Sequence, residues 1–225
     1  MDITRAGEIL DYWIPKDGSA DYDKWFMKSH EYDDEIKNKF GDLLKEAELG
    51  NGFNWLITKD SFVAYIILMD QFSRHIYRGY GDSFKNDNGA MIFTDLGFNL
   101  YREQLVGYEF MFAYMPYMHT ENYEYQKKGR SYFNKHMELY KIDTFNPQER
   151  KITDPDVIPH MIKFEPTRFD REFNMLKSME THIKGHLQTI LSYGRFPKRN
   201  KALGRETTIQ EEQYMNRKEV KNRPY

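Results

Sequence analysis

Cysteine is absent from the 225 residues of this chain. Its absence excludes disulfides, thiol nucleophiles and thiolate metal sites. Long apolar runs are also missing, because the longest, residues 62–69, falls far short of the roughly 20 residues that span a bilayer. The first residues contain no apolar segment of the kind found in secretory signal peptides. We therefore expect a cytoplasmic protein that does not associate with membranes.

Neither sign of charge dominates. Lysine and arginine number 33, aspartate and glutamate 35, and the net charge is −2. Without a broad positive field, we expect no binding to nucleic acid. The phosphate-binding loop, the dinucleotide glycine pattern and the hydrolase nucleophile elbow are missing as well. The sequence thus assigns no cofactor and no familiar enzyme class.

Aromatic residues are plentiful, with 17 Tyr, 16 Phe and 3 Trp. Each of them can remove roughly 150–250 Å² from water, which supplies a sizeable core. We expect Trp25 and Phe26 to be buried. Residues 62–69 are apolar on all sides, which predicts a buried central helix over about 61–77, capped by Asp60.

Apolar residues elsewhere recur at spacings of three and four, which is typical of amphipathic helices. No segment has the alternation of a strand, so the predicted fold class is all-α, with successive helices antiparallel. The remaining predicted helices span about 4–14, 33–49, 88–104, 107–118, 121–140 and 170–192, and a last one follows the S/T-x-x-E capping box at Thr208.

The length suits one domain, which we place over residues 1–215. Four prolines punctuate residues 141–168, and we interpret this stretch as a loop or insertion. Residues 216–225 form a charged tail.

A first polar cluster follows the apolar half of the central helix. Asp70, Arg74 and Arg78 are spaced four apart and share one helical stripe, while Gln71 and His75 form a second stripe beside it. One interpretation is a structural Asp70–Arg74 ion pair with cations at the helix end. The other is that Arg74 and Arg78 point into a binding site.

A second cluster lies at a helix junction, where His119 and Glu121 are two residues apart. Together they could act as acid and base. The simpler interpretation is a helix cap beside a hydrogen-bonded histidine. On the penultimate helix, His182 and His186 have a spacing that zinc sites use, but no glutamate follows His182, and we expect no metal.

The third cluster is a turn rich in arginine, residues 193–208. Arg195, Arg199 and Arg205 could hold a phosphate or carboxylate, because guanidinium groups bind such anions in a bidentate way. Alternatively, these arginines close helix ends and pair with Asp70 or Glu121.

At these clusters the chain resembles the DUF924 proteins, a family of unknown function. The matching segments are LMDQFSRHIYRG (68–79), MPYMHTE (115–121) and HLQTILSYGRFPKRNKALGRETT (186–208). The resemblance implies an all-α, TPR-like array of helical hairpins and no settled reaction. Ser73, His75 and Lys198 depart from the family pattern, which has proline, asparagine and histidine there.

Two functions remain open at this point: binding of a small anionic ligand, with acid–base chemistry, or a non-catalytic scaffold for a protein partner. The sequence assigns no oligomeric state. For the first function, the candidate catalytic residues are His119, Glu121 and Asp70. The candidate ligand-binding residues are Gln71, Arg74, Arg78, His186, Arg195, Arg199, Asn200 and Arg205.

Overall fold

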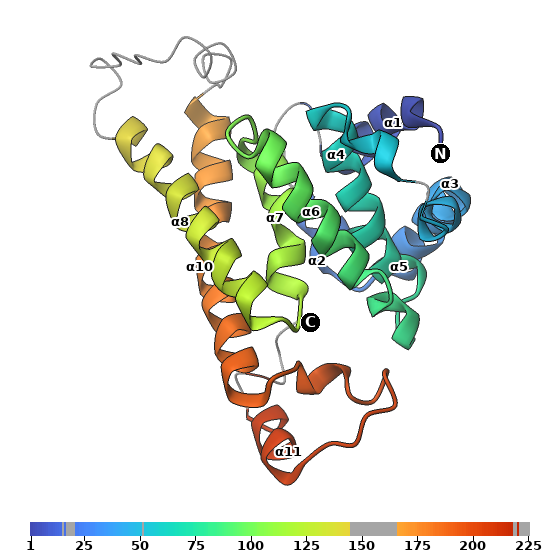
Figure 1. Ribbon diagram of the computed structural model, residues 1–225, viewed down its shortest axis with the longest axis vertical. Coiled ribbons are helices and arrows are strands. Elements are labelled where there is room, and N and C mark those ends of the chain that lie inside the picture. The colour runs from blue at the N-terminus through green and yellow to red at the C-terminus, as the bar shows by residue number, and fades with distance from the viewer. Residues whose placement is uncertain (15, 17–20, 51, 145–165, 218–219, 221–225) are drawn as a thin grey trace.

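A computed structural model describes residues 1–14, 16, 21–50, 52–144, 166–217 and 220 (Figure 1). The described residues form helices and no strand, as the sequence predicts. The α-helices are α1 (Ala6–Trp13), α2 (Tyr22–Phe26), α3 (His30–Glu48), α4 (Lys59–Ile66), α5 (Ser73–Ile76), α6 (Asp87–Tyr101), α7 (Gly107–His119), α8 (Tyr123–Thr144), α10 (Pro166–Tyr193) and α11 (Ile209–Met215).

Between α4 and α5 the chain forms a π-helical turn, η3 (Ile67–Phe72), so the predicted helix over 61–77 is one continuous rod with a change of pitch. Every residue from Phe62 to Met69 is buried, in agreement with its uniform apolarity. The predicted cap is wrong by two residues: Thr58 caps α4 through a reciprocal bond with Ser61, and Asp60 lies in the first turn. Thr58 is the cap because its extended backbone lets its hydroxyl oxygen accept the Ser61 N–H.

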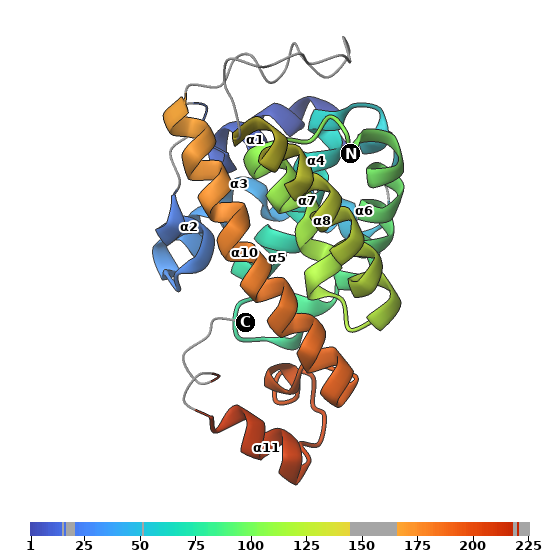
Figure 2. The ribbon, with the colours of Figure 1, turned by 90° about the vertical axis from the view of Figure 1, so that its left-hand side faces the viewer.

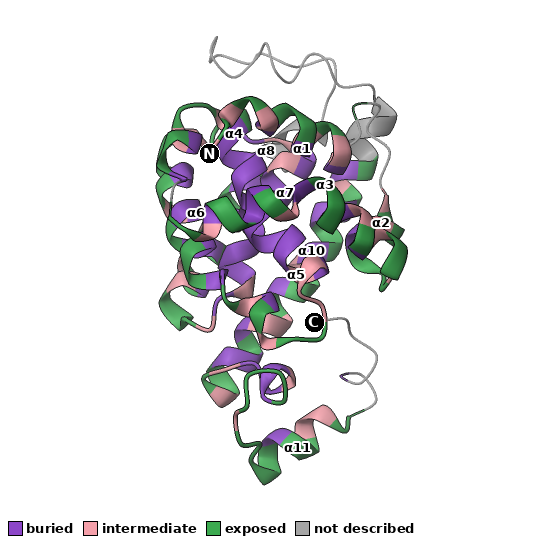
Figure 3. Ribbon diagram, turned by 90° about the vertical axis from the view of Figure 1, so that its right-hand side faces the viewer, coloured by how far each residue is buried: buried purple, intermediate pink, exposed green. Residues whose placement is uncertain are grey.

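Helix α7 is the second buried element, and nearly all of its side chains lie in the core (Figure 3). It packs against α4, α6, α8 and α10. Figure 2 shows α10 running alongside α7 and α8 towards α11. Of the two aromatic residues expected in the core near the N-terminus, Trp25 is buried, whereas Phe26 is exposed because α2 has only one face against the body.

The proposed insertion, 141–168, falls mainly outside the described residues, although α8 extends to Thr144 and α10 already begins at Pro166. Most of the charged tail, 216–225, also lies outside them. No helix in the described part of the chain is both long enough and apolar enough to cross a membrane. The TPR-like stacking of hairpins stays a prediction.

Candidate functional site

The π-helical turn η3 places Asp70 and Gln71 at the end of the apolar segment of the central rod. Such turns are rare, and they recur at functional sites. Asp70 is fully buried. The Ser73 hydroxyl donates to the carbonyl of Met69 at 2.7 Å, which satisfies a backbone acceptor where the helical pattern changes. The local backbone therefore places the Asp70 carboxylate in the interior of the protein.

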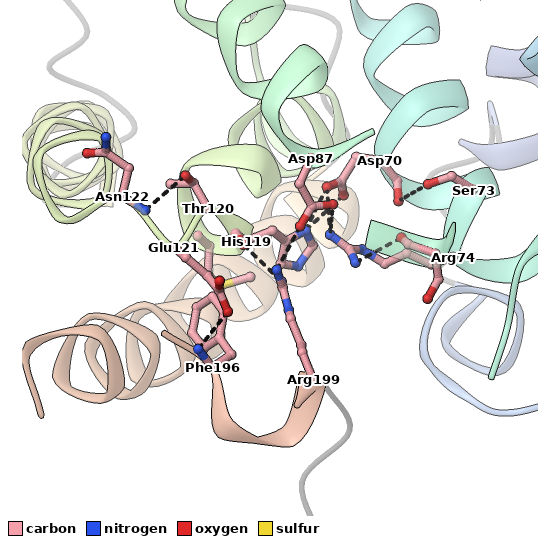
Figure 4. A network of polar contacts seen from close by, with 12 residues as sticks. Asp70, Ser73, Arg74, Asp87, His119, Thr120, Glu121, Asn122, Phe196 and Arg199 are labelled. Atoms are coloured by element: carbon pink, nitrogen blue, oxygen red, sulfur yellow. Dashed lines mark hydrogen bonds and ion pairs between the residues drawn. The ribbon is translucent and has the colours of Figure 1, made fainter. Parts of the chain in front are cut away.

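Asp70 meets the imidazole of His119, the last residue of α7 (Figure 4). Nδ1 of His119 lies 2.8 Å and 2.9 Å from the two carboxylate oxygens. Carboxylate oxygens accept, so Nδ1 carries the proton, and the lone pair of a neutral ring is on Nε2. No hydrogen bond to Nε2 is formed by any described residue. This is the arrangement in which a carboxylate orients a histidine base.

Pro116 accounts for where His119 sits. It occupies the last turn of α7, and its carbonyl accepts the N–H of Thr120, after which the backbone becomes extended. His119 is therefore at a helix end and is only partly covered, with 12% of its side chain exposed. A group at this position can meet a ligand, whereas Asp70 behind it cannot.

Two arginines and Asp87, at the start of α6, extend the cluster. Arg74 contacts Asp70 at 3.2 Å and Asp87 at 2.8 Å. Arg199 reaches the other oxygen of Asp87 at 2.8 Å and the carbonyl of His119 at 2.8 Å. With His119 neutral, the two aspartates and two guanidinium groups balance to zero charge.

These charges shift one another's pKa values. Burial alone would raise the pKa of Asp70, but His119 and Arg74 outweigh it and hold the pKa well below its usual range. Burial would likewise lower the pKa of Arg74, and Asp87 and Asp70 reverse this shift. Burial, with Arg74 nearby, lowers the pKa of Arg199 to about 10. Both arginines and the carboxylate thus stay charged at neutral pH.

The arginine-rich turn is tied to the same helix junction through Glu121. Arg205 binds both oxygens of Glu121, at 2.7 and 3.0 Å, and the backbone N–H of Phe196 donates to one of them at 2.8 Å. Arg205 also contacts Asn200 at 3.1 Å. Glu121 therefore anchors the turn to the helix junction. Burial alone would raise the pKa of Glu121, but the hydrogen bonds from Arg205 and from the Phe196 backbone outweigh it and lower the pKa.

Arg195 and Asn200 attach α11 to this turn. Arg195 binds both oxygens of Glu211, at 2.7 and 2.9 Å, and the Asn200 amide donates to Glu211 at 3.2 Å. Glu211 also closes the capping box with Thr208 that the sequence predicts.

Arg78 belongs to a different cluster. It binds both oxygens of Asp33 on α3, at 2.6 and 2.8 Å, and His75 contacts the same carboxylate at 2.8 Å. Burial and Arg78 lower the pKa of His75 to about 4. The structure thus does not bring Arg78 together with His119.

His186 on α10 lies beside His119, with ring centroids 6.3 Å apart. Gln71, in turn, donates to Asp70 and contacts the sulfur of Met115, so it supports the carboxylate from behind. Sequence reasoning missed Asp87 and Asp33, and it missed that Glu211 of the predicted capping box also pairs with Arg195. Nothing in the local sequence marks these ion pairs, because the partners come from distant segments.

The chain belongs to the DUF924 family, described as bacterial proteins of unknown function, whose profile matches residues 9–219. Among solved structures, it is similar to ATU0120 of Agrobacterium tumefaciens, a protein of unknown function. The identity is 25%, the TM-score is 0.68, and the match covers 95% of this chain and 97% of that one. Among curated proteins no relative matches this chain.

Proposed function

We propose that this protein binds a small anionic ligand, bearing a phosphate or a carboxylate, next to His119, and that His119 exchanges a proton with it. The observation that carries the proposal is the Asp70–His119 pair. Nδ1 of His119 is held 2.8 Å from the buried carboxylate of Asp70, while Nε2 of His119 has no hydrogen-bond partner among the described residues. A histidine oriented in this way is a general acid or base.

The charge around His119 favours an anion. Arg74, Arg199, Asp70 and Asp87 sum to zero, so a protonated His119 would leave one positive charge in a poorly hydrated site. In addition, Nε of Arg74 is buried without an acceptor among the described residues. A ligand oxygen with negative charge would complement both features, and a charge that develops when His119 accepts a proton would be stabilised there.

The remaining candidates act in this proposal as supports. Gln71 and Arg74 hold Asp70, and Arg199 holds the His119 carbonyl. The turn that carries Arg199 is held in place by contacts of Glu121, Arg205, Asn200 and Arg195. Arg78 anchors α5 on α3, and His186 flanks the site.

The alternative function is a helical scaffold that binds a protein without catalysis. One observation favours it: Arg74, Arg78, Arg195, Arg199 and Arg205 each have a carboxylate partner within the chain, as expected of ion pairs that only hold a fold.

The test is a thermal-shift screen against nucleotides, sugar phosphates, polyphosphates and organic acids. It compares the natural protein with His119→Asn, whose amide N–H can still donate to Asp70 but which lacks Nε2. His30→Asn, at an exposed position on α3, is the matched control. Saturating ligand stabilises by about 2.7 kcal/mol at a hundred times Kd, which is a shift of several degrees.

We expect a ligand that shifts the natural protein and His30→Asn but not His119→Asn, with similar unliganded midpoints for all three. Absence of any shift across the screen would overturn the proposal. So would a ligand that binds His119→Asn as tightly as the natural protein. Either result would favour the scaffold.

A further inference from the structure

His186 lies beside His119, with ring centroids 6.3 Å apart, and has a defined tautomer. Its Nδ1 lies 2.8 Å from the backbone carbonyl of His182, one turn earlier in α10. A carbonyl oxygen can only accept, so Nδ1 of His186 carries the proton and Nε2 presents a lone pair. Among the described residues none donates to that Nε2.

The environment keeps His186 neutral. Burial and, to a smaller extent, the neighbouring His119 lower its pKa to about 3. The ring of Phe196 packs edge-on against it, with centroids 5.3 Å apart. His186 therefore offers no positive charge to an anion, and its contribution to a ligand is a hydrogen-bond acceptor.

The two neighbouring imidazoles thus share one tautomer, with the proton on Nδ1 and the lone pair on Nε2. His119 directs Nδ1–H to Asp70, and His186 directs Nδ1–H to a carbonyl. Each neutral ring then has only a lone pair left for a partner, and two lone pairs cannot bond each other. What satisfies both is a molecule with two hydrogen-bond donors close together, next to the guanidinium groups of Arg74 and Arg199.

We propose, on the basis of the function proposed above, that the ligand is a polyhydroxylated anion of the sugar-phosphate or sugar-acid class, which donates neighbouring hydroxyl groups to Nε2 of His119 and Nε2 of His186. The hydroxyl on His119 is the one whose proton is exchanged, since Asp70 stabilises the imidazolium that forms. The hydroxyl on His186 is held for orientation only.

Calorimetry with two matched pairs of probes tests this inference. Glycerol 1-phosphate is compared with propyl phosphate, and glycerate with propionate. The members of a pair share the anionic group and differ by two hydroxyls. The proteins are the natural chain, His186→Asn, His186→Phe and the control His30→Asn. Asparagine can keep the bond to the His182 carbonyl, and phenylalanine keeps the ring volume, so one of them preserves the fold.

Each neutral hydrogen bond changes Kd by about fivefold. We expect the natural chain to prefer the hydroxylated member of at least one pair by more than tenfold. His186→Asn or His186→Phe should reduce that preference by about fivefold without weakening the plain anion. Equal binding of both members, or a preference unchanged in folded His186 variants, would overturn this inference while leaving the anion site intact. No binding of any probe would overturn both.

Discussion

At the residue scale, Arg199 shows why arginine, and not lysine, is needed at the centre of the network. Its guanidinium lies between two aromatic rings, with its central carbon 4.5 Å from the Phe84 centroid and 4.6 Å from that of Phe196. Its edge binds Asp87 and the carbonyl of His119 at the same time. Only a planar cation can stack on two faces and still donate along its edge.

Replacement of Arg199 should therefore destabilise the whole chain. Arg199→Ala leaves Asp87 with Arg74 alone and opens the space between two phenyl rings, for which we expect a loss of about 3 kcal/mol in the free energy of unfolding. Arg199→Lys keeps the charge but loses the stacked plane, and it should fall between Arg199→Ala and the natural protein. Urea unfolding measures both values.

Lys201→Ala is the control for these variants, because Lys201 is exposed two residues further along the same turn. Its effect should stay within about 0.5 kcal/mol. If Arg199→Ala were no more destabilising than Lys201→Ala, the network of Figure 4 would not hold the turn in place.

At the scale of elements, the sequence predicts the helices well because each of them carries its own periodicity. The apolar run before Asp70 predicts a buried rod, and the rod is buried. Its π-helical turn was not predicted, since a change of pitch depends on how α3, α6 and α7 pack around it. The same reason explains the site: clusters near positions 70, 119 and 199 are visible in the sequence, but Asp87, which pairs with Arg74 of the first and Arg199 of the last, is brought in only by the fold.

A second prediction concerns two helical glycines, one in a crowded helix contact and one with room beside it. A Cβ on Gly97 of α6 would lie 2.1 Å from the ring of Phe62, whereas a Cβ on Gly41 of α3 would meet only the side chain of Lys37 at 3.7 Å. Gly97→Ala should destabilise by about 1–3 kcal/mol because α6 must move away from α4. Gly41→Ala should stabilise by about 0.5–1 kcal/mol, since alanine favours the helix.

Thermal unfolding of the two variants decides this point, because each serves as the control for the other. Opposite shifts of the midpoint would confirm that α6 and α4 are in close contact at Gly97. A Gly97→Ala variant as stable as Gly41→Ala would show that the contact is looser than described.

At the scale of the whole molecule, stability without disulfides comes from an aromatic core and from ionisable groups buried in fixed states. His75 and His136 are both buried, and His136 stacks on Phe110 with ring centroids 3.5 Å apart. Burial lowers the pKa of His136 to about 3 and, with Arg78, lowers that of His75 to about 4. Both lie well below the value of about 6.5 for an unfolded chain.

The sign of the resulting pH dependence follows from proton binding. Between pH 6.5 and the lowered pKa, the unfolded chain binds a proton at each of these histidines and the folded chain does not. Stability is therefore complete above about pH 6.5 and falls as the pH drops. The loss at pH 5 should be about 2 kcal/mol for each histidine. The buried Asp70, whose pKa is also lowered, adds a further loss only in stronger acid.

A variant separates this effect from general acid unfolding. His136→Gln removes one titrating group, so its free energy of unfolding should vary less steeply between pH 7 and pH 5 than that of the natural protein, by about one proton. His30→Gln, at an exposed position, should keep the natural slope. Urea unfolding at several pH values measures the slopes, and the glutamine variant need not be as stable as the natural protein, because only the change with pH is compared. An unchanged slope in His136→Gln would mean that His136 takes up its proton in the folded state, and the tight stack on Phe110 would then have to accommodate an imidazolium.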